Sequence, residues 1–513
     1  MNELLRKMKE QSNQTLTENG AITYSSTLNK VYDLFALGAA MRGNTESECM
    51  FLFKQAYNEN PTLALKCLFY LRDIRGGQGE RRFFRLCIKW LAMRYTDEME
   101  HLIKYVPEYG RYDDLFELFG TPLEEEMMGY IKYIIDKNED HLIYKWMPSI
   151  NASSLNTKER GRRFASEFGM TERQYRKMLT EGRKACNLVE SLMSQNHWDQ
   201  IAFDKLPSRA GILYSKAFAR REETRERYAA FMSNDKTKVN AGTLYPYDVV
   251  AKAIDIMRCN DYWDRHETPI NDTNRIAINK YWDNLTDYFN GATLNALCVC
   301  DTSGSMTRGY NSKIAPIDVA IALSLYTAER AKGPFQNHFI SFSSRPTLIE
   351  TEGIDFCDKV RRIYRQNLCE NTNIEATFDL VLNTAIRNGL EQEDLPEYLV
   401  IVSDMQFDNA RGYYQYGYTF NERNHNLNTQ SLMENIRTKW ERSGYNMPKL
   451  IFWNVNAAAN GGSIPMKDED GITFVSGASP SIFTSIMTGK TGQDLMMEAL
   501  LSARYSNIFS IKS

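Results

Sequence analysis

The feature that most constrains the fold of this chain is a change in hydrophobic periodicity near residue 291. Before that point apolar residues recur at every third or fourth position, which is the spacing of one helix face. After it, short β-rich runs alternate with helical stretches, the pattern of a parallel sheet covered by helices. The sequence therefore predicts a multidomain chain with an N-terminal tail over residues 1–20, an α-helical repeat domain over 21–290 and an α/β doubly wound domain over 291–513.

The helical part contains residues that commonly start and stop helices. Asn60 followed by Pro61 predicts a helix start, because the first helical position does not need the N–H group that proline lacks. Gly76, Gly77 and Gly79 predict the turn between two antiparallel helices. Helices of about 15 residues joined by short turns favour helix pairs stacked in a solenoid, although no clean sequence repeat is visible.

Five apolar runs in the second part have the length of buried strands. They lie at residues 294–301, 337–343, 397–404, 449–456 and 472–477. Helices are predicted between and after them, at 314–331, 373–389, 429–444 and near 494–505. The nearly continuous apolar character of the strands indicates burial on both faces, and such sheets bind ligands at the carboxyl ends of their strands.

Composition excludes several classes of protein. The 513 residues are 43% hydrophobic, which is enough to build folded cores and excludes intrinsic disorder. No apolar run reaches the roughly 18 residues of a membrane-spanning helix, and the first twenty residues lack the apolar segment of a signal peptide. Nine scattered cysteines without a CxxC pair predict reduced thiols. We therefore expect a cytoplasmic protein that does not contact a membrane.

Side chains that carry oxygen follow two of the predicted strands. Asp301, Ser303 and Ser305 alternate on a glycine-containing turn after the first strand, and Asp404 closes a later strand. Thr372 lies between them in the chain, just before a predicted helix. Because Mg²⁺ prefers six oxygen ligands and needs only one or two carboxylates, these residues predict a site for Mg²⁺ or another divalent cation such as Mn²⁺ or Ca²⁺. The alternative is that the DTSGS segment only caps a helix.

This pattern resembles the metal-ion-dependent adhesion site of von Willebrand factor A domains, in which D-x-S-x-S is followed by a Thr and an Asp on two further loops. The resemblance implies that Ser303, Ser305 and Thr372 coordinate the cation directly. It further implies that Asp301 and Asp404 ligate partly through water, and that an open coordination position accepts an acidic group of a partner protein.

One position departs from the pattern of that family. An Asp often follows the Thr in related domains, whereas Asn373 stands at that place in this chain. The site would then have one nearby carboxylate fewer, and Thr377 is the alternative for the third hydroxyl ligand.

A helical part followed by such an A domain resembles the Ro, or TROVE-type, RNA-binding proteins. In that family HEAT-like helical repeats close into a ring that takes in the ends of misfolded small RNAs, and duplexes bind its basic outer face. LYPYDVVAKAI (244–254) is similar to a proline-containing helix start late in that ring. RDIRGGQGERRFFR (72–85), PEYGRYDDLF (107–116) and KWMPS (145–149) are closer still to an uncharacterised domain-of-unknown-function branch with the same layout. The resemblance implies a ribonucleoprotein.

Net charge alone does not predict RNA binding. The chain has 62 Lys and Arg against 65 Asp and Glu, a formal charge of -3, so a site for a polyanion has to be local. Arginine at helix ends suits phosphate, because the guanidinium fork and free backbone N–H groups face the same anion. The candidates for RNA contact are Arg72, Arg75, Arg81, Arg82, Arg85, Arg160, Arg162, Arg163, Arg173, Arg176 and Lys177, with Arg183 and Lys184 close by. Alternatively these residues form solvated helix faces or pair internally, as Arg75 would with Asp113 or Asp114.

No arrangement of residues indicates catalysis. The six histidines are scattered, and a serine hydroxyl bound to a cation is a ligand rather than a nucleophile. We therefore expect a protein that is not an enzyme.

Segment 408–428, rich in Tyr and Asn and too polar for a core, predicts a long loop on the rim of the metal site.

Two functions agree with these observations. In the first, the chain is a non-catalytic Ro-like scaffold whose helical repeats hold structured or misfolded small RNA, while the metal site engages an acidic partner. In the second, the chain is a protein-interaction or assembly module that captures a partner carboxylate at the metal site and binds no RNA. The near-neutral helical part favours the second reading, and the sequence does not specify an oligomeric state.

Overall fold

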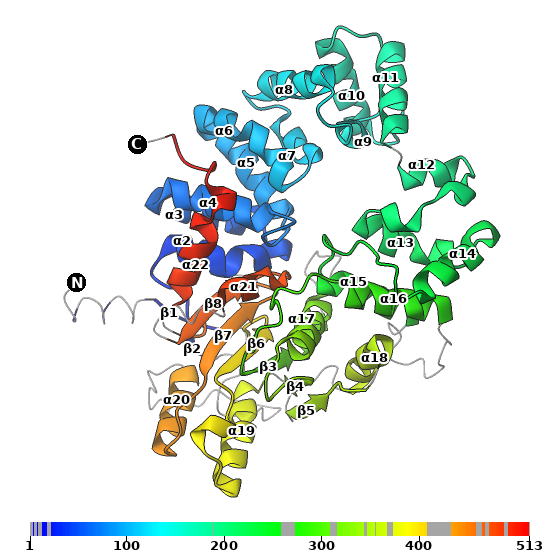
Figure 1. Ribbon diagram of the computed structural model, residues 1–513. Coiled ribbons are helices and arrows are strands. Elements are labelled where there is room, and N and C mark those ends of the chain that lie inside the picture. Colours follow the sequence, from blue (N-terminus) through cyan, green and yellow to red (C-terminus); the bar gives the residue numbers. More distant parts are fainter. Residues whose placement is uncertain are drawn as a thin grey trace, which may run out of the picture. The chain divides into compact units, whose positions relative to one another are not determined.

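The computed structural model describes residues 4, 8, 13–17, 22–186, 188–257, 272–307, 315–342, 346–353, 355–366, 373–407, 432–457, 464–466, 471–486 and 491–511 (Figure 1). The chain divides into two compact units. Unit 1 comprises Met1–Cys67, Leu244–Ile270 and Leu285–Arg504, and unit 2 comprises Leu68–Thr243, Asn271–Asn284 and Tyr505–Ser513.

Unit 1 is built around a six-stranded mixed sheet with the strand order β5-β4-β3-β6-β7-β8 (Figure 1). Its strands are β3 (Ala296–Asp301), β4 (His338–Phe342), β5 (Thr347–Glu350), β6 (Tyr398–Ser403), β7 (Lys449–Asn454) and β8 (Ile472–Ser476). All neighbours pair in parallel except β5, which runs antiparallel to β4 at one edge. The five predicted strands are confirmed. The sequence did not predict β5 because this four-residue strand buries only one side chain, Ile349.

The strongly apolar strands lie in the middle of this sheet. Every residue of β3 is buried, and Val299 pairs with Ile340 of β4 on one side and Ile401 of β6 on the other. Burial on both faces explains why these runs do not alternate between apolar and polar residues. A second, two-stranded sheet pairs β1 (Gln14–Leu16) with β2 (Ile22–Tyr24).

Helices flank the strands of unit 1. α17 packs along β3, β4 and β6, while α2 packs against β8. The helices are α2 (Lys30–Leu37), α3 (Glu46–Glu59), α4 (Pro61–Arg72, shared with unit 2), α15 (Pro246–Met257), α17 (Pro316–Arg330), α18 (Phe356–Gln366), α19 (Ile374–Asn388), α20 (Leu432–Arg442), α21 (Phe483–Ile486) and α22 (Gly492–Leu501). The predicted helices between the strands are confirmed, and α18 is an additional one.

The compact units do not follow the division expected between residues 290 and 291. Tyr32 of α2 accepts a hydrogen bond through its hydroxyl from the backbone N–H of Phe474 in β8, at 2.8 Å. α15, which begins at the predicted proline Pro246, packs against α17. Helices from the first part of the chain therefore cover elements of the α/β unit, because their buried faces find apolar partners there.

Unit 2 consists of helices and short 3₁₀ turns. The helices are α5 (Arg82–Arg94), α6 (Thr96–Leu102), α7 (Val106–Tyr109), α8 (Glu124–Lys137), α9 (Ile143–Trp146), α10 (Leu155–Glu167), α11 (Glu172–Ala185), α12 (Val189–Ser194), α13 (Ser208–Phe218), α14 (Glu222–Ser233) and α16 (Asp272–Asp283). Pairs such as α10 with α11 and α14 with α16 pack against each other. The helical character of this part is confirmed, whereas a solenoid or ring stays a prediction.

The turn predicted from three glycines connects α4 to α5. The Asn60 side chain accepts from the backbone N–H of Leu63 at 3.0 Å and so caps the start of α4 at Pro61. Gly79 has a φ of 65°, a left-handed conformation that glycine adopts without strain. Behind the turn, the rings of Phe69 and Phe84 pack edge to face with centroids 5.2 Å apart, which holds the two helices together.

Two further expectations concern thiols and membranes. The seven cysteines among the described residues are free. Within the part of the chain that the structure describes, no helix is both long and apolar enough to cross a membrane.

Candidate metal centre and basic surfaces

The carboxyl end of β3 holds the predicted D-x-S-x-S residues together. Asp301 is the last residue of the strand and is completely buried. Its Oδ1 accepts a hydrogen bond from the backbone N–H of Ser303 at 2.9 Å, so one carboxylate oxygen does cap the following turn. The hydroxyl oxygens of Ser303 and Ser305 lie 3.1 Å apart. The capping alternative therefore accounts for one oxygen of Asp301, and the two serine hydroxyls form a hydrogen bond with each other beside it.

The neighbouring strand β6 contributes a second carboxylate and a serine. The Ser403 hydroxyl donates to Oδ2 of Asp301 at 2.5 Å, which links the carboxyl ends of β3 and β6. Asp404 follows directly, is 2% exposed, and accepts from the backbone N–H of Gln406 at 3.2 Å. Asp301 and Asp404 thus lie at the carboxyl ends of two strands, as the sequence predicts, and the structure shows that these strands are parallel neighbours.

Backbone strain marks the same turn. Met405 has a φ of 61°, a left-handed conformation that costs a non-glycine residue roughly 1–2 kcal/mol. Its backbone N–H donates to the Ser403 hydroxyl at 3.0 Å. Ser403 therefore supports both the strained turn and the orientation of Asp301.

The arrangement suits a small, hard cation. A buried carboxylate and two converging hydroxyl groups are oxygen donors of the kind that Mg²⁺ binds. No group of three or more His, Cys, Asp or Glu side chains that could hold a metal occurs among the described residues. A cation at the end of this sheet would consequently depend on the serine hydroxyls.

The third hydroxyl of the predicted site belongs to Thr372 or, alternatively, to Thr377. Thr372 and segment 408–428 lie outside the residues that the structure describes. Asn373 caps α19, because its side chain accepts from the backbone N–H of Ala376 at 3.0 Å. Thr377 is completely buried in α19, and its hydroxyl has no hydrogen-bond partner among the described residues. That is unusual, since a helical threonine can bond the carbonyl four residues earlier.

Two buried polar residues at this sheet edge were missed by the sequence reasoning. Ser403 is one, and Asn454 at the end of β7 is the other, paired with Ser403 in the sheet register. Oδ1 of Asn454 accepts from the backbone N–H of Asn456 at 3.0 Å, while its Nδ2 has no partner among the described residues. The available signal was a polar residue that closes a long apolar run, as in YLVIVS and KLIFWN.

One more buried carboxylate lies in the helix that packs against this turn. Asp318 is in the first turn of α17, which contacts the 3₁₀ turn Gly304–Thr307. Its Oδ1 is buried without a hydrogen-bond partner in the described part of the chain. Burial raises the pKa of Asp318 from 3.8 to about 6.

The first arginine-rich segment is largely committed to internal ion pairs. Arg72 is 1% exposed, and its Nε donates to Oδ2 of Asp114 at 2.8 Å. Arg85 contacts both Asp113 and Asp114 at 2.7 Å. The internal pairing considered for Arg75 is therefore made by Arg72 and Arg85. Arg72 is too deeply buried to contact RNA, so its prediction as an RNA ligand is wrong.

The remaining arginines of this segment face solvent. Arg75 donates to the backbone carbonyl of Glu108 at 3.2 Å. Arg81 and Arg82 are exposed at the start of α5. These three side chains remain candidates for contact with an anion.

The second segment divides between structural and exposed cations. Arg183 donates to the carbonyls of Tyr144 and Met147 and to the hydroxyl of Ser149, at 2.8–2.9 Å, and so connects α11 to α9 and the loop that follows α9. The guanidinium groups of Arg160 and Arg163 lie over the ring of Phe119, at 5.1 and 5.5 Å from its centroid. Exposed positions are occupied by Arg162, which pairs with Glu172, and by Arg173, Arg176, Lys177 and Lys184.

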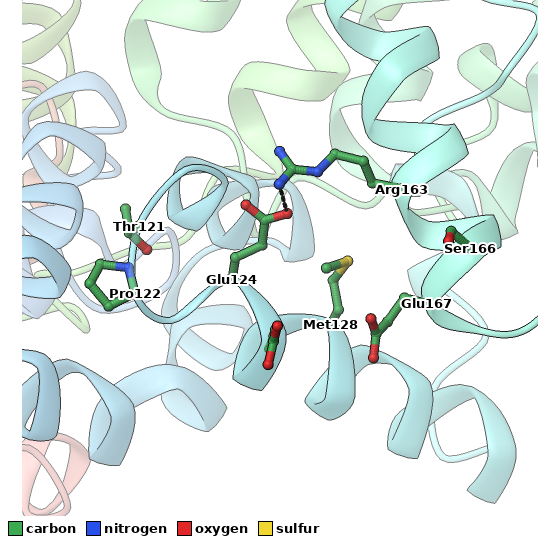
Figure 2. Close-up of a pocket in the computed structure, with 8 residues that line it drawn as sticks. Thr121, Pro122, Glu124, Met128, Arg163, Ser166 and Glu167 are labelled. Carbon is green, nitrogen blue, oxygen red and sulfur yellow. Dashed lines mark ion pairs between the residues drawn. The ribbon is translucent and has the colours of Figure 1, made fainter.

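A polar pocket of about 430 Å³ opens between the loop before α8 and the end of α10 (Figure 2). Arg163 points over the pocket and forms an ion pair with Glu124. The pocket is lined by Thr121, Pro122, Glu124, Glu125, Met128, Arg163, Ser166 and Glu167. Three carboxylates against one guanidinium make it acidic and unfavourable for a phosphate.

Comparison with known proteins gives related sequences along most of the chain. The family model of a domain of unknown function, DUF2828, matches residues 17–98 and 141–291, and that of a second domain of unknown function, DUF7788, matches residues 295–504. The uncharacterised protein L728 of Acanthamoeba polyphaga mimivirus is 27% identical over 95% of this chain and 86% of the relative. The Ro (RSR) protein of Deinococcus radiodurans, a solved structure, has a TM-score of 0.46 and 12% identity over 93% of this chain and 99% of that chain.

These matches agree with the resemblance to an uncharacterised branch that the sequence indicated. A von Willebrand A domain in the second part stays a prediction. Both parts of the chain are therefore similar to domains of unknown function.

Proposed function

We propose that this chain is a non-catalytic RNA-binding scaffold, in which the helical unit holds structured small RNA and the α/β unit holds a divalent cation. The observation that carries the RNA part is a stripe of exposed cations along α11. Arg173, Arg176, Lys177 and Lys184 share one side of the helix, because they lie three, four and eleven positions apart. The exposed Arg81, just before α5, the exposed Arg82 at its start and the resemblance to Ro-type proteins give further support.

The helix that carries the stripe is packed closely on its inner side, and one stripe residue, Lys177, forms an exposed ion pair with Glu181 at 3.7 Å. Gly182 lies against the ring of Tyr144, where a Cβ atom would not fit, and the Tyr175 hydroxyl donates to the carbonyl of Pro148 at 3.0 Å. On the outer side, Arg173, Arg176 and Lys184 form no ion pair with any residue in the described part of the chain. Cations that are free of internal partners can each neutralise a phosphate and release its counterions.

The RNA proposal is tested by replacing the stripe. The triple variant Arg173→Ala, Arg176→Ala, Lys177→Ala removes three exposed charges. We expect the slope of log affinity against log salt for a structured small RNA to fall by about two to three, because each phosphate contact contributes about 0.7–0.9. The matched control replaces Arg220 and Arg225, which are also exposed in unit 2, and should leave the slope unchanged.

A second test of the RNA proposal measures the nucleic acid that co-purifies with the protein at low and at high salt. Small RNA released by high salt supports the proposal. Absence of nucleic acid after low-salt purification, together with no shift of structured RNA in a gel, would exclude it.

We propose that Asp301, Ser303, Ser305 and Asp404 hold Mg²⁺, with Thr372 or Thr377 as the third hydroxyl. The hydroxyl groups of Ser303 and Ser305, 3.1 Å apart and next to the buried Asp301 in the chain, are oxygen donors of the kind that a hard cation binds. The Thr377 hydroxyl is buried without a hydrogen-bond partner among the described residues. Bound there, Mg²⁺ or a similar ion would supply a positive charge with an open position for a carboxylate of an acidic partner. Ser403 would hold Asp301 in place through their hydrogen bond.

The metal proposal is tested by calorimetric titration with MgCl₂. Ser303→Ala and Ser305→Ala each remove one hydroxyl, and we expect each to lower the affinity for Mg²⁺ by at least about tenfold. Thr307→Ala is the control, since the Thr307 hydroxyl lies on the same turn but donates to the carbonyl of Gly304. Equal Mg²⁺ affinity in all three variants would contradict the proposal.

The chain has a second candidate function as a protein-interaction module without RNA. The acidic pocket beside Arg163 favours this second function. Its three carboxylates lie in the same unit as the basic stripe and would repel RNA phosphates. Under this function the Asp301→Ala variant loses a Mg²⁺-dependent protein partner, and RNA is not bound by the wild type. Both functions include the proposal that the chain is not an enzyme. His338 does not act as a base for Ser303 in this proposal, because it lies at the amino end of β4, whereas Ser303 follows the carboxyl end of the parallel strand β3.

A further inference from the structure

An arginine cluster in unit 2 carries more positive than negative charge. Four guanidinium groups and three carboxylates lie within electrostatic reach of one another at the start of α5 and in the 3₁₀ turn Tyr112–Leu118. The members of this arginine cluster are Arg72, Arg81, Arg85, Arg111, Asp113, Asp114 and Glu117.

Three of the four arginines form ion pairs with the three carboxylates. Arg72 and Arg85 take opposite oxygens of Asp114, and Arg85 also contacts Asp113 at 2.7 Å and Glu117 at 3.7 Å. Nε of Arg111 lies 3.1 Å from Oδ1 of Asp113. The exposed Arg81 side chain has no hydrogen bond or ion pair with any residue that the structure describes.

The position of Arg81 is electrostatically unfavourable without a ligand. Arg81 immediately precedes α5 and does not cap it, and the first turn contains no acidic residue. The carboxylate at this helix end is that of Glu80, which accepts from the backbone N–H of Arg82 at 3.1 Å. The amino end of a helix carries a partial positive charge, so a cation there is repelled. Arg72 and Arg85 repel Arg81 as well, although Asp113 and Asp114 attract it. Local conflicts of this kind in natural proteins occur mostly at functional sites.

Arg111 is held next to Arg81 by an aromatic ring. Its guanidinium lies over the ring of Trp146, 4.2 Å from the centroid, which fixes its plane at a partly exposed position. Burial, together with repulsion from Arg81 and Arg72, lowers the pKa of Arg111 to about 10 against the opposing carboxylates. Arg111 therefore remains charged at neutral pH and adds to the excess of positive charge.

We propose that Arg81 and Arg111 bind a phosphate of RNA at the start of α5, while Arg72 and Arg85 position the carboxylates behind them. One phosphodiester supplies the single negative charge that balances four guanidinium groups and three carboxylates. The guanidinium groups donate to the phosphate oxygens, and the helix end adds to their attraction. The occupant as RNA rests on the proposed function, whereas the phosphate site itself rests on the arginine cluster.

The test compares the two ends of one helix. Arg81→Ala removes the unpaired guanidinium, and Arg94→Ala removes an exposed one from the last turn of α5. With a fluorescently labelled structured RNA, we expect Arg81→Ala to weaken binding about tenfold, since hydrogen bonds to charged groups contribute on this scale. The salt slope should fall by about 0.7–0.9, while Arg94→Ala matches the wild type. Arg81→Lys should retain the slope, because it keeps the charge.

A second probe separates this inference from the proposed function. If the wild type binds RNA and Arg81→Ala binds it as tightly as Arg94→Ala does, the inference is overturned and the function stands. Calorimetry with tripolyphosphate covers the case in which no RNA binds. Binding of tripolyphosphate that Arg81→Ala abolishes would then support the phosphate site and overturn RNA as its occupant, and no binding of either probe would overturn both.

Discussion

The two arginine-rich segments of the helical unit look alike in the sequence but differ in what their side chains contact. In residues 72–85, two arginines pair with the buried Asp114 of a distant turn. In α11, Arg173 and Arg176 face solvent without an internal partner among the described residues. Arginine content therefore does not distinguish a cation that stabilises the fold from one that is available to a ligand; the position of the nearest carboxylate does.

The difference follows from where the acidic residues stand. Asp113 and Asp114 are some thirty residues away from Arg85 in the chain, and only folding brings them together. The acidic neighbours of α11 lie on exposed positions, where an ion pair contributes at most about 1 kcal/mol. Arg72 and Arg85 in residues 72–85 are thus held by buried ion pairs, whereas the exposed cations of α11 are not held in this way.

The largest effect that sharpens this comparison is expected from Arg72→Ala. It leaves Asp114 buried with one cation fewer, and loss of one partner of a buried ion pair costs about 3–5 kcal/mol. We expect a large fall in the unfolding temperature of the helical unit, measured by differential scanning calorimetry.

A double variant shows whether charge is the cause. Arg72→Met with Asp114→Leu removes both charges and should recover part of the lost stability, since an apolar pair can replace a buried ion pair. An Arg72→Ala protein with the unfolding temperature of the wild type would remove the distinction between the two segments.

The sequence predicted the strands and part of the candidate site because each strand, with the turn that follows it, consists of consecutive residues. Asp301, Ser303 and Ser305 share one turn, and Asp404 was placed by the rule that parallel strands end at the same edge. The partners of the arginines and the role of Ser403 were not predictable in this way, because they depend on side-chain packing between segments. The same reason explains why α2 was not expected to pack against β8.

The second largest effect is expected at the structural arginine of α11. Arg183→Ala removes three hydrogen bonds to Tyr144, Met147 and Ser149, and hydrogen bonds to charged groups contribute about 1.5–3 kcal/mol. We expect a lower unfolding temperature and unchanged salt dependence of RNA binding. Arg183→Lys, which keeps one donor group, should lose less stability; equal stability of wild type and Arg183→Ala would show that α11 is held by other contacts.

A buried carboxylate without a cation provides the opposite case to Asp114. Burial raises the pKa of Asp318 to about 6, so the folded state binds its proton more tightly than the unfolded state does. Its destabilising effect is absent below about pH 4, grows as the pH rises and is complete above about pH 6. Asp318→Asn should therefore raise stability by about 1–2 kcal/mol at pH 7.5, and by almost nothing at pH 4, in urea unfolding at the two pH values. A gain of equal size at both would mean that the charge is not the cause.

The smallest effect on stability is expected where the comparison predicts free cations. Arg173→Ala and Arg176→Ala remove exposed side chains that have no internal ion pair in the described part of the chain, so each should change the free energy of unfolding by less than about 0.5 kcal/mol. Chemical denaturation of the two variants beside Arg183→Ala, from the same helix, measures this directly. A loss of stability as large as that of Arg183→Ala would show that the stripe residues stabilise the fold. They would then not count as cations that are free to bind RNA. Stability within 0.5 kcal/mol of the wild type, combined with a reduced salt slope for RNA, would separate binding from folding within a single helix.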